Sequence, residues 1–125
     1  MNDAPFQDVR MLALWRDDRT ESPLTFDLRI DAASRRIVSH WDSFGACDLD
    51  GGKFRPFVLR RDGAIDFGAG ARDNWRTDVR RAVMRVGERF TVHWNECDCG
   101  LYEIVKVATL GAKSEIGEKS GTGDA

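Results

Sequence analysis

The sequence predicts a small, mainly β domain, folded as an antiparallel barrel or sandwich of roughly six to eight strands. Three observations lead to this fold class. Short runs alternate apolar and polar residues with the period of two that a half-buried strand requires. Turn-forming residues separate these runs at hairpin spacing. Only one segment has helical periodicity, and one short helix is predicted there, near residues 73–82, as the alternative to a strand.

The first predicted hairpin lies before residue 42. Val9–Trp15 is a short apolar run bounded by polar residues, which indicates a buried strand. A charged turn ending at Pro23 follows, and Leu24–Asp31 then alternates apolar and polar residues without interruption. Residues 32–35 have the right length for a hairpin loop, so Ile37–Trp41 is predicted to return as the partner of Leu24–Asp31.

Two more hairpins are predicted further along the chain. Phe44–Lys53 contains three glycines and is interpreted as a loop. Phe54–Arg61 and Ala64–Phe67 flank an Asp-Gly pair, which is a strong hairpin signal. Arg89–Trp94 and Leu101–Leu110 form the third hairpin, joined by a loop that contains cysteines. Both faces of Leu101–Leu110 are partly apolar, as expected of a central strand.

The segment Asp73–Val86 fits two patterns. As a helix it would be capped by Asp73 and would present one apolar face. As a strand it would alternate Ala82, Met84 and Val86 against Arg81, Val83 and Arg85. Because its neighbours in the sequence read as strands, we expect a short helix or turn followed by a strand.

Length and composition indicate one domain over residues 1–110, followed by a disordered tail over 111–125 that is rich in Gly, Ser, Lys and Glu. The chain has 125 residues and a formal net charge of −2, which argues against general binding of polyanions such as nucleic acids. No apolar run approaches the roughly 20 residues that span a bilayer. The polar N-terminus lacks a secretory signal, and the three cysteines are expected to be reduced thiols in the cytoplasm.

Two stretches of the chain resemble each other: His40–Asp48 and His93–Cys99 both begin with His-Trp and continue into a segment that contains cysteine. Each histidine is predicted to lie at a strand end, so the two stretches could lie side by side. We therefore expect a binding site for a protein partner or a small molecule at these strand ends. The predicted ligand-binding residues are Trp41, Trp94, His40 and His93. Most tryptophans should nevertheless be core residues.

The same stretches suggest a zinc site as an alternative. Zinc takes four tetrahedral nitrogen or sulfur ligands, and Cys97, Cys99 and His93 would supply three, with His40 or Cys47 as the fourth. The spacing matches no zinc-finger pattern, so the simpler interpretation is that Cys47 is a small buried residue and the others lie on a loop. A redox pair or a cysteine nucleophile is less well supported, because no accompanying signature is present.

An arginine run over residues 72–89 is the second alternative site. If the segment is helical, Arg72, Arg76 and Arg80 lie on one stripe that could contact phosphates of a nucleic acid, with Trp75 beside it. Arg81, in the same run, is a further candidate for anion binding. Acidic residues lie within the same run, so a solvated charged surface explains it equally well. Taken together, the sequence predicts a non-catalytic binding module with no required cofactor, able to form a homo-oligomer, and shows no convincing catalytic constellation.

Overall fold

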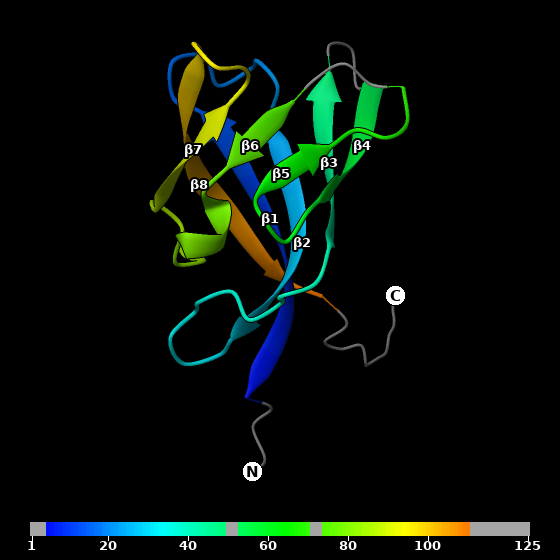
Figure 1. The fold of residues 1–125 in the computed structure, drawn as a ribbon. Helices are drawn as coiled ribbons and strands as arrows, with labels where there is room; N and C mark the ends of the chain where they lie inside the picture. Colours follow the sequence, from blue (N-terminus) through cyan, green and yellow to red (C-terminus); the bar gives the residue numbers. More distant parts are fainter. Residues whose placement is uncertain (1–4, 50–52, 71–73, 111–125) are drawn as a thin grey trace, which may run out of the picture.

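The protein is an eight-stranded closed antiparallel barrel, which confirms the predicted fold class (Figure 1). The structure is a computed structural model that describes residues 5–49, 53–70 and 74–110. Each strand pairs with its sequence neighbours, and β8 pairs with β1 to close the sheet. The elements are β1 (Phe6–Trp15), β2 (Leu24–Asp31), β3 (Ser43–Leu49), β4 (Lys53–Leu59), β5 (Ala64–Asp66), β6 (Trp75–Thr77), the 3₁₀ helix η2 (Val79–Arg81), β7 (Arg89–His93) and β8 (Cys99–Thr109).

The antiparallel order gives the barrel two distinct ends. Strands β1, β3, β5 and β7 finish at the end drawn uppermost in Figure 1, and β2, β4, β6 and β8 finish at the opposite end. We call these the upper end and the lower end. The short helix η2 lies at the lower end, in the connection between β6 and β7.

Side chains fill the interior of the barrel. Along β2 every second residue is buried, as the alternation in the sequence predicts. The largest fully buried side chain is that of Tyr102, whose hydroxyl donates a hydrogen bond of 3.0 Å to the backbone oxygen of Ser22. The rest of the core consists mainly of Val9, Met11, Ala13, Leu24, Phe26, Leu28, Ile30, Cys47, Phe57, Leu59, Ile65, Val79, Met84, Phe90, Val92 and Ile104.

A bulge in β8 explains why both of its faces are partly apolar. Leu12 pairs with Lys106 and Ala13 pairs with Ile104, so Val105 is an extra residue in the ladder. Ile104 points into the core before the bulge, and Val107 packs against the core after it. The apolar residues on both faces of β8 therefore follow from the bulge, which changes which alternate residues of the strand face the core.

The prediction that Ile37–Trp41 pairs with β2 is wrong. Residues 37–41 contribute only an isolated bridge between Ile30 and Ile37, and the strand that pairs with β2 is β3, from Leu24 opposite Cys47 to Phe26 opposite Gly45. The prediction of a loop over residues 44–53 is wrong for residues 44–49, which belong to β3, and for Lys53, which begins β4; residues 50–52 lie outside the described residues. Residues 32–42 instead form a long connection at the lower end, where Val38 donates a backbone hydrogen bond to Arg29.

Gly45 is predicted to be a loop residue, but it lies in β3, where its neighbours leave no room for a side chain. A Cβ atom at this position would lie 2.3 Å from the ring of Phe57 and 2.7 Å from the backbone oxygen of Thr25. Glycine inside a strand often marks such a close approach. The edge-to-face contact of Phe57 with Phe26, at 5.4 Å between ring centroids, thus depends on Gly45.

The second and third predicted hairpins are confirmed as β4–β5 and β7–β8. The order predicted for residues 73–86 is reversed, because the strand β6 precedes the single 3₁₀ turn η2. The predicted tail over residues 111–125 lies outside the described residues. Within the described ranges, no helix has the length and apolar character needed to cross a membrane.

Candidate functional sites

The two His-Trp stretches lie at opposite ends of the barrel, so the expectation that they are neighbours is wrong. His40 and Trp41 belong to the connection before β3, at the lower end. His93 ends β7 at the upper end, where its cross-strand partners are Arg76 and Cys99. Their similarity in sequence therefore does not create one shared site.

The predicted zinc ligands are not assembled. His93 and Cys99 are cross-strand partners, but Cys47 is buried in the core and His40 is at the other end of the barrel. Within the part of the chain that the structure describes, no three His, Cys, Asp or Glu side chains form a group that could hold a metal ion. Burial raises the pKa of the Cys47 thiol, which fits the role of a small core residue.

The β7–β8 turn that carries the exposed cysteines is built by its own polar residues. The Asn95 side-chain oxygen accepts backbone hydrogen bonds from Cys97 and Asp98, each 2.8 Å long. The Asn95 amide donates to the Asp98 carboxylate over 3.0 Å. These hydrogen bonds close the turn without using either thiol, so Cys97 and Cys99 remain free.

Aromatic side chains pack together at the upper end of the barrel. Trp94 contacts Trp15, Trp75 and Tyr102, with ring centroids 5.0, 6.4 and 6.4 Å apart. Phe67 contacts Trp75 at 5.0 Å between ring centroids, and the guanidinium of Arg55 lies 4.1 Å from the Phe67 ring. Trp94 therefore packs against the core, and together with His93 it also lines a hollow of about 800 Å³. A Cβ at Gly100 would lie 2.4 Å from the Trp94 ring, so this packing also requires a glycine.

Trp41 differs from the other tryptophans because it is exposed. Half of its surface, 51%, remains accessible, and the Arg29 guanidinium lies 5.6 Å from its ring. Its backbone is fixed from the interior side by Arg80, whose guanidinium donates hydrogen bonds to the oxygens of Ser39 (2.6 Å) and Trp41 (3.0 Å). Arg80 also donates to the oxygens of Arg60 and Leu59. The predicted anion ligand Arg80 is therefore a residue that positions the loop of Trp41.

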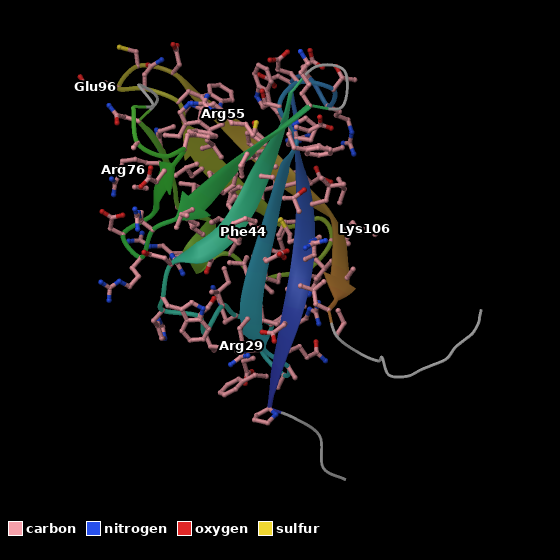
Figure 2. All side chains as sticks on the ribbon, turned by 90° about the vertical axis from the view of Figure 1, so that its right-hand side faces the viewer. Arg29, Phe44, Arg55, Arg76, Glu96 and Lys106 are labelled. Carbon is pink, nitrogen blue, oxygen red and sulfur yellow. The ribbon has the colours of Figure 1, made fainter. Side chains whose placement is uncertain are left out.

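The outward side of the β3–β4 hairpin is apolar except at Asp48, the cross-strand partner of Phe54, and sequence reasoning missed it. Phe44 and Phe54 are 62% and 65% exposed, and the register places Phe44 beside Val58 and Ala46 beside Pro56 between them. Phe44 projects from the centre of the face shown in Figure 2. We define the apolar outer face by these side chains and the neighbouring tryptophan: Trp41, Phe44, Ala46, Phe54, Pro56 and Val58.

A hollow of about 380 Å³ lies at the lower end of the apolar outer face. Trp41 and Phe44 line it together with the buried Leu28 and the aspartates 8, 27 and 42. Each of these carboxylates is paired: Asp8 with Arg29, Asp27 with Arg10 and Asp42 with Arg60, at 2.7–2.8 Å. The hydrogen bonds from these arginines lower the pKa values of Asp8 and Asp42. The hollow therefore has a neutralised rim around apolar walls.

The arginine run does not form the predicted helical stripe. Arg76 lies on β6, Arg80 and Arg81 lie on η2, and Arg72 is outside the described residues. Arg76, Arg80 and Arg81 nevertheless line a second hollow of about 360 Å³, together with Arg61 and His93. This grouping arises from the β6–η2 bend.

The fold and these surfaces define an up-and-down antiparallel β-barrel with a filled interior and its candidate sites on the outside. No family model matches the chain, and neither a curated protein nor a solved structure matches it. Function must therefore be argued from the surfaces themselves.

Proposed function

We propose that this protein is a non-catalytic binding module whose apolar outer face docks a short, extended segment of a protein partner. The observation that carries the proposal is the exposure of three aromatic side chains: Trp41 and Phe44 line one hollow, and Phe44 and Phe54 lie on the outward side of one hairpin. Outward positions on the adjacent strand β2 are polar, with Thr25, Asp27 and Arg29. Aromatic residues gathered on one exposed surface are typical of interaction sites.

The size of the apolar outer face favours a short segment as the occupant. An aromatic side chain has about 150–250 Å² to bury, so the three exposed rings present roughly 300–400 Å² to water. This is less than the ~800 Å² that each partner buries in a standard stable interface. A second copy of the chain would therefore be held weakly by this face, whereas a peptide with a few apolar anchors would match it.

The hollow beside Trp41 and Phe44 gives the segment an anchoring position. Its volume of about 380 Å³ accommodates one large side chain above Leu28. Because the surrounding aspartates are already paired with arginines, the walls favour an aliphatic or aromatic side chain over a basic one. Covering about 300–400 Å² contributes roughly 8–10 kcal/mol at 25 cal/mol per Å², and association offsets much of this. We expect micromolar affinity.

Selection of peptides from a random displayed library tests this proposal. Peptides bound by the intact protein should share apolar anchors, and the variants Phe44→Asp and Trp41→Ala should each weaken their binding at least tenfold. Val86→Ser is the matched control, because Val86 is 61% exposed but lies in the β6–β7 connection. Far-UV circular dichroism would establish that each variant is folded.

Two outcomes would contradict the proposal. In the first, no peptide is selected, or the selected peptides bind Phe44→Asp and Val86→Ser equally well. In the second, the protein forms a tight dimer in sedimentation experiments and Phe44→Asp makes it monomeric, which would assign the face to a second copy.

A further inference from the structure

We propose that the hollow between β6, η2 and the β4–β5 turn binds the phosphate group of a small phosphorylated molecule through Arg61, Arg76 and Arg81. The apolar outer face plays no part in this site. Arg76 projects at the edge of the view in Figure 2, away from Phe44.

The residues that line this hollow carry an excess of positive charge. Four arginines, at positions 61, 76, 80 and 81, lie around it with only two aspartates, Asp62 and Asp78. The whole chain has a formal net charge of −2, so the hollow reverses the overall sign of the molecule. Local concentration of one sign of charge in a concave surface focuses the field on a small ligand.

Both aspartates already hold backbone groups. One carboxylate oxygen of Asp62 accepts a hydrogen bond from the Ala64 amide (3.0 Å), and its other oxygen lies 3.9 Å from Arg76. Asp78 accepts a hydrogen bond of 2.7 Å from the Thr91 amide. These carboxylates therefore shape the turn and the strand end, and they neutralise the arginines only in part.

Arg61, Arg76 and Arg81 have guanidinium N–H groups that are not used in hydrogen bonds to other described residues. Arg76 uses one nitrogen to donate to the Asp62 backbone oxygen over 2.9 Å, which orients its guanidinium. Neither Arg61 nor Arg81 has a side-chain hydrogen bond or ion pair to another described residue at hydrogen-bonding distance, although Asp42, held by Arg60, lies near Arg61. Guanidinium groups with free donors bind phosphate oxygens in a bidentate manner.

The form of the site favours a small molecule. The arginines surround one hollow of about 360 Å³, and the predicted linear stripe that would follow a nucleic-acid backbone is not formed. Arg80 adds charge, but its donors are occupied by the oxygens of Ser39, Leu59, Arg60 and Trp41. His93, on the strand beside Arg76, borders the hollow and offers a further polar contact.

Titration with inorganic phosphate, pyrophosphate and a single-stranded oligonucleotide at low ionic strength tests this proposal, with NMR of the arginine side-chain N–H groups as the readout. We expect phosphate and pyrophosphate to shift the signals of Arg61, Arg76 and Arg81, with saturation in the millimolar range or below. Arg61→Gln and Arg81→Gln should each weaken binding at least fivefold. Arg85→Gln is the matched control, since Arg85 is also exposed but does not line the hollow and pairs with Glu88 over 3.9 Å.

Three results would overturn the proposal. The first is that phosphate leaves the three arginine signals unchanged. The second is that Arg85→Gln weakens binding as much as Arg61→Gln does, as in nonspecific attraction. The third is that the oligonucleotide binds at this site while phosphate and pyrophosphate do not, which would assign the surface to nucleic acid. Because the side chains of Arg61 and Arg81 do not line the hollow beside Trp41 and Phe44, failure here leaves the docking proposal standing.

Discussion

At the residue scale, Arg80 stabilises the loop that carries the exposed Trp41 side chain. Its guanidinium donates to four backbone oxygens, from the loop that carries Trp41 and from the end of β4. Desolvation lowers its pKa, although a guanidinium remains charged at physiological pH. The planar fork of arginine suits several acceptors at once, and lysine cannot reproduce it.

We expect Arg80→Ala to lower the free energy of unfolding by about 2–3 kcal/mol, because it leaves several carbonyl groups without their charged donor. Urea denaturation measures this change. Arg80→Lys should recover only part of the loss, whereas the neighbouring Arg81→Ala should change stability by less than about 0.5 kcal/mol. Equal effects of Arg80→Ala and Arg81→Ala would show that the four hydrogen bonds contribute little.

Gly45 is a second residue whose identity is fixed by its surroundings. We expect Gly45→Ala to destabilise the fold by about 2–3 kcal/mol, since the added methyl group would overlap the Phe57 ring and the Thr25 oxygen. In the double variant with Phe57→Leu, the loss of stability should be smaller than the sum of the losses in the two single variants, because the smaller side chain relieves the overlap. Additive losses in a denaturation series would contradict the steric explanation.

At the scale of elements, the β7–β8 hairpin is closed by Asn95 rather than by its cysteines. Removing the side-chain acceptor with Asn95→Ala should cost about 1 kcal/mol, as expected for lost turn-forming hydrogen bonds. Cys97→Ser and Cys99→Ser should leave thermal stability unchanged, with and without a chelator. A fall in melting temperature on adding the chelator would instead restore the zinc hypothesis.

At the scale of the whole molecule, the closed core makes the fold sensitive to alkali. Burial raises the pKa values of Tyr102 and Cys47, so the folded state holds both protons more tightly than the unfolded state. Their contribution to stability is complete below the unfolded values, about 8.5 for cysteine and 10 for tyrosine, and falls as the pH rises above them.

Absorbance of tyrosinate measures this directly, because Tyr102 is the only tyrosine. We expect no tyrosinate in the folded protein at pH values just above 10, followed by its appearance together with cooperative unfolding. Tyr102→Phe should reduce the alkaline loss of stability. A gradual titration near pH 10 with the fold intact would show that the hydroxyl is accessible to water.

Periodicity in the sequence determined much of the barrel. The alternation of Leu24–Asp31, the apolar run Val9–Trp15 and the Asp-Gly turn before Ala64 are local signals, and each produced the predicted strand or hairpin. These signals survive because one face of each strand must be buried wherever the strand lies.

Tertiary structure alone decided the candidate sites. Whether Gly45 belongs to a loop or a strand depends on the Phe57 ring, which is twelve residues away in the sequence. The separation of His40 from His93, and the gathering of Arg61 with Arg76 and Arg81, follow from which strands end at which end of the barrel. Such long-range placement leaves no periodic trace, because it is set by closure of the sheet rather than by the preferences of neighbouring residues.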